Sequence, residues 1–385
     1  MIYDILVVGA GPSGSYLAYL LSKNGFKVKI IDKENFPRDK VCGGGISNKT
    51  VELLDFDISS VIQKNIAGAF LSYQNKNMIV KDPGESSGIT VLRRDFDNFI
   101  LEKAINCGAE FQPNCSFVSV EERDDYINVE TSRDCIEAKY LIAADGVFSR
   151  VRNKVFGKNL ITYAPSLEAL VYVDQDIIER FENKILMDFG GMRRGYGWIF
   201  PKSDHLNIGV FSIFGSRNIK NDLERFMKYY NSLKTYRNIE YKGFSIPLKN
   251  KYKVYEKGNI WLIGDAAGFA ESFYGEGIYF ALKSASIAYE ALAGSFEMNE
   301  VNYYSNLVKE KMLEDLFYSE LNARLFYPVQ RFGYFNMVRN RRVNYYFAGL
   351  ISGTVSYKEC FYKTLLSFPY WILSDKYKYV DTYNL

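Results

Sequence analysis

The sequence predicts an α/β protein in which a β-α-β domain is interrupted by a β-rich insertion and followed by a helical C-terminal region. Three patterns lead to this prediction. A strand, a glycine-rich turn and a helix open the chain within residues 2–24. Apolar and polar residues alternate through most of residues 160–250, as in half-buried strands. Residues 301–385 are largely helical in pattern and rich in aromatic side chains.

The first fifty residues justify the β-α-β unit. The apolar run Ile5–Val8 predicts a buried strand, and an apolar-periodic helix follows from Ser15 to about Asn24. A second strand, residues 27–31, ends at Asp32. The turn between the first strand and the helix contains Gly9, Gly11, Pro12, Ser13 and Gly14. This is the Rossmann-type dinucleotide-binding fingerprint in its required strand–turn–helix–strand context.

Each residue type in the fingerprint has a physical role. Gly9 makes the tight turn, Gly11 lets a pyrophosphate approach the backbone, and Gly14 lets helix and strand pack closely. The start of the helix offers amide groups and partial positive charge to the phosphates. The carboxylate of Asp32 is placed to accept a hydrogen bond from a ribose hydroxyl. The alternative is a glycine-rich turn that binds no ligand.

A second glycine-rich segment, residues 264–278, follows the apolar run Ile260–Ile263. Its sequence changes abruptly from a buried strand to an acid, small residues and glycines. Asp265 at the end of the strand suits a loop in which a carboxylate meets a sugar or ribityl hydroxyl. Gly275 and Gly277 would let the backbone approach a flat ring closely.

Composition excludes several classes of function. The 385 residues carry a formal net charge of only +3, so we expect no nucleic-acid partner. The five cysteines form no CxxC pair and His205 is the only histidine, which argues against a metal site and most histidine-based catalysis. His205 follows a polar turn and is expected at the surface. An odd number of cysteines without a secretory signal predicts a cytoplasmic protein, and no apolar run is long enough to span a membrane.

Aromatic residues make up 16% of the chain, including 31 Tyr and 28 Phe. Such an excess indicates first of all that aromatic side chains pack in the core, but it also suits an apolar tunnel for a hydrophobic ligand. Tyr196, Trp198 and Phe200 alternate along one predicted strand, so they share a face. That face either packs on the core or lines such a tunnel.

The elements predict a discontinuous first domain, unlike the two consecutive halves of an NAD dehydrogenase. The predicted boundaries are 1–65, 95–160 and 250–300 for the nucleotide-binding domain, 66–94 and 161–249 for the β-rich substrate domain, and 301–385 for the helical C-terminal region.

Several spaced motifs occur together and in order. They are the glycine fingerprint with its acid, Arg93-x-x-Phe96-Asp97, Asp145-Gly146 and Gly264-Asp265. This set resembles the flavoprotein hydroxylase superfamily that includes p-hydroxybenzoate hydroxylase. Three further segments are Cys42–Gly45, Tyr196–Pro201 and Gly275–Ile278. Within the superfamily these look like the geranylgeranyl reductase family, whose archaeal members saturate the isoprenoid chains of membrane lipids.

The resemblance implies that FAD is the cofactor and lies extended across the first domain. Ser13 and its neighbours would hold the pyrophosphate, Asp32 the adenosine ribose and Asp265 a ribityl hydroxyl. Arg93 would reach the phosphate–ribityl region of the cofactor. The backbone of Val118 would meet the adenine, although a core valine is an equal alternative.

The family also implies residues around the flavin ring. Gly277 and Ile278 would present amides near the N1–O2 edge. The loop with Cys42, Gly43 and Gly45 would lie near the isoalloxazine. Cys42 is either a small buried filler or a group that relays a proton or gates access to the flavin, and both interpretations stay open.

The aromatic face of the insertion would then wall a prenyl tunnel opposite the flavin, through Tyr196, Trp198 and Phe200. The implied reaction is FAD-dependent saturation of C=C bonds in prenyl chains, with protonation to a tertiary cation that aromatic faces tolerate. One alternative is a flavin monooxygenase or halogenase, because residues 198–201 lie near a halogenase tryptophan motif. Another is a non-catalytic protein that binds prenyl lipid or flavin.

No second dinucleotide fingerprint is visible, so we expect electrons from NAD(P)H by transient contact or from a ferredoxin-like protein. A lipid substrate must come from a bilayer, which predicts peripheral membrane contact through residues 326–346, including Arg339, Arg341 and Arg342. A plain helical cap is the alternative. Arg193 and Arg194 are candidate anchors for a lipid phosphate, or else a solvated charge pair.

Overall fold

The computed structural model describes residues 1–81, 87–251, 253–295 and 302–366. These residues form two compact units, each assembled from three stretches of chain. The first unit contains residues 1–40, 93–163 and 246–316, and the second contains 41–92, 164–245 and 317 onward. The predicted class, an α/β fold with an interleaved β-rich part and a helical C-terminal region, is confirmed.

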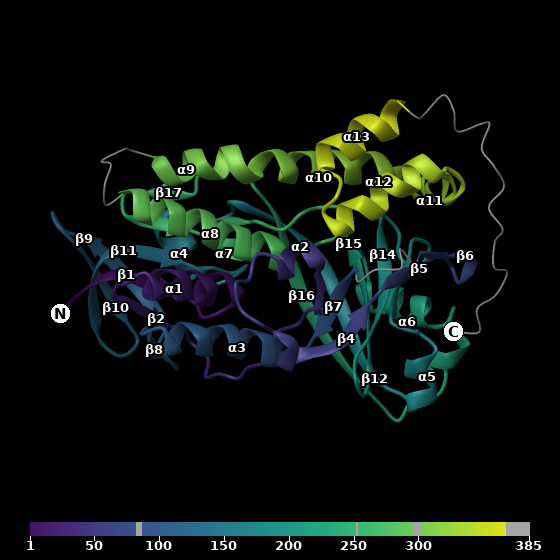
Figure 1. Cartoon of the computed structure of the whole chain (residues 1–385), viewed down its shortest axis with the longest axis horizontal. Helices are drawn as coiled ribbons and strands as arrows, with labels where there is room; N and C mark the ends of the chain where they lie inside the picture. Colours follow the sequence, from purple (N-terminus) through teal and green to yellow (C-terminus); the bar gives the residue numbers. More distant parts are fainter. Residues whose placement is uncertain (82–86, 252, 296–301, 367–385) are drawn as a thin grey trace. The chain divides into compact units, whose positions relative to one another are not determined.

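The first unit is built on an eight-stranded sheet with a parallel centre (Figure 1). The parallel strands, in spatial order, are β18 (Ile260–Leu262), β11 (Cys135–Ala143), β1 (Ile2–Val8), β2 (Val28–Ile31) and β8 (Glu110–Gln112). The antiparallel strands are β9 (Phe117–Glu122), β10 (Ile127–Thr131) and β17 (Glu256–Lys257). Apolar runs such as Ile5–Val8 are buried on both faces, as parallel strands require.

Helix α1 (Pro12–Lys23) packs against both α3 (Arg93–Asn106) and α8 (Ile278–Ser295). Its first helical residue is Pro12, whose fixed φ suits that position. The shorter helices of this unit are α4 (Arg150–Val155), α7 (Gly264–Ala267), α9 (Tyr303–Val308) and the π-helical turn η3 (Lys309–Leu313). Tyr304 of α9 stacks on Trp261 and donates a 2.8 Å hydrogen bond to the Leu262 carbonyl, which fixes α9 to β18.

The second unit contains a seven-stranded sheet. Its strands, in spatial order, are β16 (Asn238–Asn250), β12 (Ile161–Tyr172), β15 (Leu206–Ser212), β14 (Gly195–Pro201), β13 (Lys184–Asp188), β5 (Gly68–Tyr73) and β6 (Lys76–Lys81). One face packs on α5 (Gln175–Glu179), α6 (Ile219–Met227) and η2 (Asn231–Leu233) through a core that includes Ile199, Val210 and Phe226.

A three-stranded sheet completes the β structure of the second unit. It consists of β3 (Gly45–Ser47), β7 (Gly88–Val91) and β4 (Ile62–Ile66), with α2 (Asn48–Val51) and η1 (Ser59–Val61) between its strands. Because β3 and β4 both pair with β7, residues 41–65 lie in the second unit and not in the nucleotide-binding domain, where the sequence had placed them.

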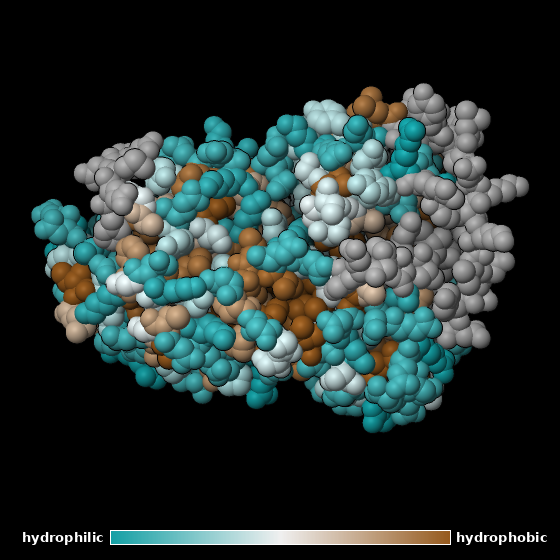
Figure 2. Space-filling view, in the orientation of Figure 1, coloured by the Kyte–Doolittle hydropathy of each residue, from teal (hydrophilic) through white to brown (hydrophobic). Residues whose placement is uncertain are grey.

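The helical C-terminal region is divided between the units, with residues 301–316 in the first. The helices that follow are α10 (Glu314–Phe326), η4 (Tyr327–Val329), α11 (Gln330–Arg339), α12 (Arg341–Ser352) and α13 (Tyr357–Leu366). Helix α12 packs against both α11 and α13. No helix in the described part of the chain is both long and apolar enough to cross a membrane. Hydrophobic surface is exposed at the end of α13 (Figure 2), which carries Tyr362, Leu365 and Leu366.

Candidate functional site

Four candidate residues of the first unit follow the carboxyl ends of its parallel strands. Gly9 follows β1, Asp32 follows β2, Asp145 comes after β11 and Asp265 after β18. Strands that run parallel bring these ends to one edge of the sheet, which is where open α/β sheets bind their ligands. The candidate residues therefore lie at one edge of the sheet.

The glycine turn leaves room only where a ligand needs it. Gly9 has φ +107°, and a Cβ there would lie 2.3 Å from the Ala144 carbonyl oxygen. A Cβ on Gly14 would lie 2.0 Å from the carbonyl oxygen of Gly9. Beside Gly11, in contrast, the nearest atom would be Arg38 Nη2 at 3.6 Å. Two glycines thus serve packing, while Gly11, at the N-terminus of α1, has only the end of the Arg38 side chain nearby.

Two backbone amides fix the carboxylate of Asp32. Its Oδ2 accepts the amide of Ala10 at 2.7 Å, and its Oδ1 accepts the amide of Glu34 at 2.9 Å. Each carboxylate oxygen has a further lone pair, so a ribose hydroxyl can still donate to it. The predicted ribose contact is compatible with this geometry and stays a prediction.

Arg38 is a cofactor-binding candidate that sequence reasoning missed. Asp97 is fully buried and accepts two hydrogen bonds from Arg93, at 2.7 and 2.8 Å. Arg38 Nη1 lies 3.0 Å from the same carboxylate without hydrogen-bond alignment, and it is buried with no other partner. Nη2 of the same guanidinium is the atom nearest to Gly11, and a guanidinium with unused donor capacity at this position fits a phosphate group. Asp97 therefore holds Arg93 and places Arg38.

The Asp145-Gly146 turn has a structural role. Asp145 Oδ2 accepts the amides of Arg150 and Val151 at the start of α4, at 2.7 and 3.2 Å. Burial raises the pKa of the Asp145 carboxyl. The buried Arg152 then donates to the carbonyls of Val147 and Ala266, at 2.8 and 2.9 Å. Arg152, which the sequence did not reveal, ties this turn to α7.

The second glycine-rich segment forms a loop before α8. A Cβ on Gly277 would lie 3.7 Å from Asp265 Oδ1, so the two predicted residues are neighbours. Ile278 begins α8, which puts Gly277 and Ile278 at a helix N-terminus as predicted. The fully buried carboxylate of Glu271 accepts the amides of Phe273, Tyr274 and Glu276, at 2.7, 2.6 and 3.0 Å. Glu271, which the sequence analysis missed, shapes this loop.

Val118 lies on β9 and its side chain is 45% exposed, so the core-valine alternative is wrong. Strand β9 pairs only with β10, which leaves its outer edge without a partner strand among the described residues. The contact of the Val118 backbone with adenine stays a prediction.

In the second unit, the loop with Cys42 meets the predicted aromatic residues. A Cβ on Gly43 would lie 3.0 Å from Trp198 Nε1, and one on Gly45 would lie 2.8 Å from the Phe200 ring. Tyr196, Trp198 and Phe200 share one face of β14, with neighbouring ring centroids 6.1 and 6.3 Å apart. Glycines are required here because these rings occupy the space of their side chains.

A chain of buried polar groups joins Cys42 to Trp198. The Cys42 amide donates to Glu168 Oε1 at 3.3 Å, and Asn207 Nδ2 donates to Glu168 Oε2 at 3.1 Å. Trp198 Nε1 in turn donates to Asn207 Oδ1 at 2.8 Å. Burial raises the pKa of the Glu168 carboxyl. Cys42 itself is only half-buried, and its sulfur accepts the Gly44 amide, so it is not a fully buried filler.

Lys202 holds the same loop through hydrogen bonds to backbone carbonyls. Its Nζ donates to the carbonyls of Gly43 and Val91, at 2.8 and 2.9 Å. Burial lowers the pKa of Lys202 to about 7, while Cys42 and Glu168 favour its charged form. Neither Glu168 nor Lys202 was found from the sequence.

The expectation that His205 lies at the surface is wrong, because the residue is only 4% exposed. Its carbonyl accepts the Lys202 amide at 2.9 Å, which closes the polar turn tightly. The imidazole packs against the Tyr172 ring, with centroids 5.2 Å apart. Burial lowers the pKa of His205.

Comparison with known proteins identifies the family. Residues 2–165 match the family model of an FAD binding domain. The chain is 29% identical to the digeranylgeranylglycerophospholipid reductase of Methanococcus vannielii, over 84% of this chain and 87% of that protein. It is 31% identical to the geranylgeranyl diphosphate reductase of Rhodobacter capsulatus, over 76% of this chain and 75% of that protein. The chain belongs to the geranylgeranyl reductase family.

Solved structures share the fold of this geranylgeranyl reductase family member. A geranylgeranyl bacteriochlorophyll reductase-like protein from Thermoplasma acidophilum aligns with a TM-score of 0.77 and 22% identity, over 96% of this chain and 98% of the other. The halogenase PltM, in complex with phloroglucinol and FAD, aligns with a TM-score of 0.66 and 17% identity, over 84% and 75%. At these identities the likeness concerns the fold alone.

FAD is the cofactor of this geranylgeranyl reductase family member, and it is an FAD-dependent oxidoreductase. The first unit fits a dinucleotide, since the end of the Arg38 side chain is all that a Cβ on Gly11 would meet within 4 Å, and the buried Nη1 of Arg38 has no hydrogen-bond partner. The contacts of Asp32 with the adenosine ribose, of Ser13 with the pyrophosphate and of Asp265 with the ribityl chain stay predictions.

Proposed function

We propose that this protein saturates the carbon–carbon double bonds of prenyl chains carried by membrane lipids. Relatives named geranylgeranyl or digeranylgeranylglycerophospholipid reductase share 26–31% identity with most of the chain, and this carries the proposal. The geometry supports it, because the glycine loop at Cys42 packs against an aromatic face of the kind that a prenyl chain would contact.

Reduction of an isolated C=C bond requires protonation before hydride transfer. Hydride attack on an isolated alkene is unfavourable, since no neighbouring group stabilises the carbanion that it would leave. Protonation instead gives a tertiary cation, which the faces of Tyr196, Trp198 and Phe200 stabilise through cation–π attraction. The hydride that quenches the cation would come from reduced FAD bound in the first unit.

Cys42 is the group of the glycine loop that can hold the proton, at Sγ. Glu168 acts as a positioning residue, because it holds the Cys42 amide through Oε1. The Lys202 ammonium fixes the loop carbonyls and stabilises negative charge on Cys42 or Glu168 after proton release. These three groups keep the loop rigid while the proton moves.

Electrons would reach the flavin by transient contact with NAD(P)H or from a ferredoxin-like protein, since the sequence holds one dinucleotide fingerprint. Peripheral contact with the inner face of the cell membrane would deliver the lipid to this cytoplasmic protein. The exposed Arg339 and Arg342 and the apolar end of α13 support such contact. The side chain of Arg341 lies outside the described residues.

The test is an anaerobic single-turnover experiment. FAD-loaded protein is reduced with dithionite and mixed with digeranylgeranylglyceryl phosphate in detergent micelles. We expect the flavin to reoxidise and the lipid mass to rise by two hydrogens per saturated bond, whereas the fully saturated lipid should leave the flavin reduced. Reduced flavin that persists with the unsaturated lipid would overturn the proposal.

The same experiment addresses the alternative of a monooxygenase or halogenase, which the fold of PltM keeps open. Those reactions require oxygen, so they cannot reoxidise the flavin in its absence. Oxygen or halide in the product, formed only after air is admitted, would favour that alternative.

A further inference from the structure

The second unit contains a pocket of about 910 Å³ that the flavin chemistry does not use. Five arginines line it, from three different elements. They are Arg193 and Arg194 between β13 and β14, Arg225 on α6, and Arg331 and Arg339 on α11. The lining contains neither aspartate nor glutamate. So many like charges repel one another, and a ligand of opposite charge would relieve that repulsion.

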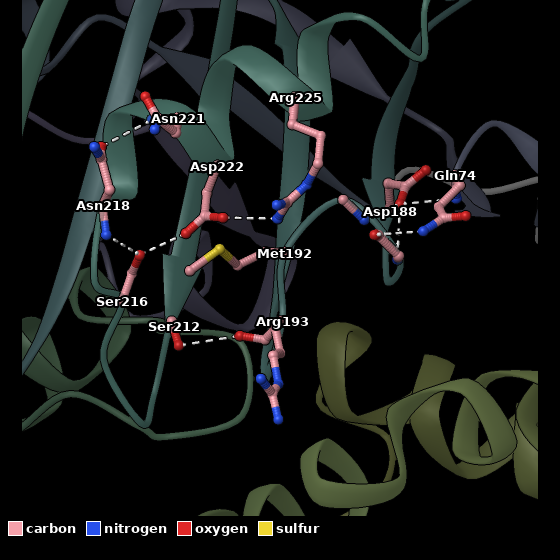
Figure 3. A network of polar contacts seen from close by, with 12 residues as sticks. Gln74, Asp188, Met192, Arg193, Ser212, Ser216, Asn218, Asn221, Asp222 and Arg225 are labelled. Atoms are coloured by element: carbon pink, nitrogen blue, oxygen red, sulfur yellow. Dashed lines mark hydrogen bonds and ion pairs between the residues drawn. The ribbon is translucent and has the colours of Figure 1, made fainter.

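Only some of these charges are balanced within the protein. Arg225 pairs with Asp222 at 2.6 Å, and Ser216 donates to the other oxygen of that carboxylate (Figure 3). Neither Arg193 nor Arg331 forms an ion pair with any carboxylate in the described part of the chain. Figure 3 shows the Arg193 guanidinium extending away from the Asp222–Arg225 pair, with no contact drawn to it.

The turn that presents two of the arginines is built rigidly. The buried Asp188 accepts the amides of Gly190 and Gly191, at 2.7 and 2.6 Å. Arg194 adopts φ +57°, a left-handed conformation that is costly for a residue with a side chain. Such strain persists only where the surroundings enforce it, so the turn is held in place rather than free to relax.

Gln330, at the start of α11, fastens this turn to the helix that carries the other arginines. Its Nε2 donates to the carbonyls of Phe189 and Met192, and its Oε1 accepts the Gly195 amide at 3.3 Å. One buried amide thus binds both ends of the turn. The backbone positions that carry these arginines are therefore set before any ligand arrives, which lowers the entropic cost of binding.

Aromatic side chains connect the pocket to the glycine loop. Tyr196 packs on Phe189 with centroids 6.0 Å apart, Phe189 on Tyr334 at 6.0 Å, and Tyr334 on Phe335 at 5.5 Å. Phe335 lines the pocket together with Tyr73, Tyr327 and Phe332. The distance along β14 from Phe200 to Arg194 is roughly 20 Å at about 3.3 Å per residue. This aromatic row, in which Phe189 and Tyr334 are buried, therefore ends at a cluster of positive charge.

We propose that this pocket, which we call the arginine pocket, binds the phosphate group of the prenyl substrate. Guanidinium groups match phosphate oxygens with paired hydrogen bonds, and aromatic walls suit the first isoprene units beside the phosphate. The inference rests on the proposed function. The phosphate is that of a glycerophospholipid or that of a prenyl diphosphate, and the two are separated by experiment.

The kinetic test compares charged and uncharged substrates. The double variant Arg193→Gln/Arg331→Gln removes two guanidinium groups that pair with no carboxylate among the described residues. No buried carboxylate therefore loses its partner. We expect the KM for digeranylgeranylglyceryl phosphate to rise roughly tenfold or more with kcat unchanged. The KM for digeranylgeranylglycerol, which lacks the phosphate, should not change. Arg180→Gln, at the C-cap of α5 and outside the pocket, is the matched control.

Geranylgeranyl diphosphate forms the second arm of this experiment. A larger rise in its KM than in that of the glycerol phosphate would assign the pocket to a diphosphate headgroup, and the reverse would assign it to a phospholipid. Equal effects on substrates with and without phosphate, or no effect on either, would overturn the arginine pocket.

A binding measurement separates this inference from the proposed function. Titration calorimetry of FAD-loaded protein with inorganic diphosphate should show binding that weakens with added salt and is lost in the double variant. Diphosphate binding without lipid reduction would overturn the proposed function but not the assignment of the arginine pocket. Lipid reduction with no loss of diphosphate binding in the double variant would overturn the pocket alone.

Discussion

The ammonium group of Lys202 contacts the glycine loop and has almost no access to water. The side chain is 1% exposed, and two of its hydrogen bonds go to the carbonyls of Gly43 and Val91. These carbonyls and the Glu168 carboxylate partly replace the lost hydration. Burial still lowers the pKa of Lys202 to about 7, so its charge changes near neutral pH.

That pKa predicts a pH-dependent stability. The unfolded chain keeps the proton up to the ordinary lysine pKa of 10.5, whereas the folded protein releases it near 7. Between these values the unfolded state binds more protons, so the free energy of unfolding rises with pH, by at most about 1.4 kcal/mol per unit. Lys202→Met should remove this rise in urea denaturation between about pH 6 and 9.

The exposed Lys228 provides the control, since Lys228→Met should keep the wild-type slope. A Lys202→Met variant with that same slope would show that the buried lysine does not titrate in this range.

Cys42 is the residue whose role can be decided by a single-atom change. Serine keeps an acceptor for the Gly44 amide but holds its proton far more tightly than a thiol. We expect Cys42→Ser to be stable and yellow with FAD, and to reduce prenyl lipid about a hundredfold more slowly. Cys135→Ser, at an exposed position of the first unit, should change nothing. Unimpaired turnover in Cys42→Ser would assign the residue to packing.

At the scale of elements, the loop before α8 depends on one buried acid. Both oxygens of Glu271 accept backbone amides, and in Glu271→Gln one of them becomes a donor that faces the amide of Phe273 or Tyr274. We expect a loss of about 1–3 kcal/mol in the free energy of unfolding and weaker FAD binding. Urea denaturation and titration of the apoprotein with FAD measure the two effects.

Glu290→Gln, on the exposed side of the same helix, is the matched control and should shift stability by less than about 0.5 kcal/mol. If Glu271→Gln binds FAD as tightly as the control does, the loop before α8 is not part of the cofactor site.

Elements with strong local patterns could be predicted from the sequence. Strand β1, the glycine turn and helix α1 follow from an apolar run, a fingerprint and a helical period, all within 24 residues. The shared face of Tyr196, Trp198 and Phe200 follows from the alternation of side chains along a strand. These patterns suffice because each is decided by neighbours along the chain.

The polar groups that hold the site together could not be predicted in the same way. Lys202 and Gly43 lie 159 positions apart, and Arg152 and Ala266 lie 114 apart. No local pattern tells which lysine or arginine will be buried against a distant carbonyl. His205 was misplaced for the same reason, since the ring that covers it belongs to Tyr172 on another strand. Burial of polar residues is decided by pairing between distant segments.

At the scale of the whole molecule, the two units divide the chemistry. The residues of the dinucleotide fingerprint belong to the first unit, and the glycine loop, the aromatic row and the arginine pocket belong to the second. The domain boundaries depend on strand pairing rather than on composition, because residues 41–65 join the second unit through β7. The sequence showed that the chain is interleaved, but not where each stretch ends.

The interleaving governs how the protein is made. Helix α1 packs against α8, which begins only at Ile278, so the first unit is incomplete until nearly three quarters of the chain has left the ribosome. By then the strands of the second unit, up to β16, have been synthesised as well. Until then the part of α1 that packs against α8 lacks its partner, although α3 is already available, and a chaperone that shields apolar segments would suit this interval. Both units therefore depend on stretches of chain that are synthesised late.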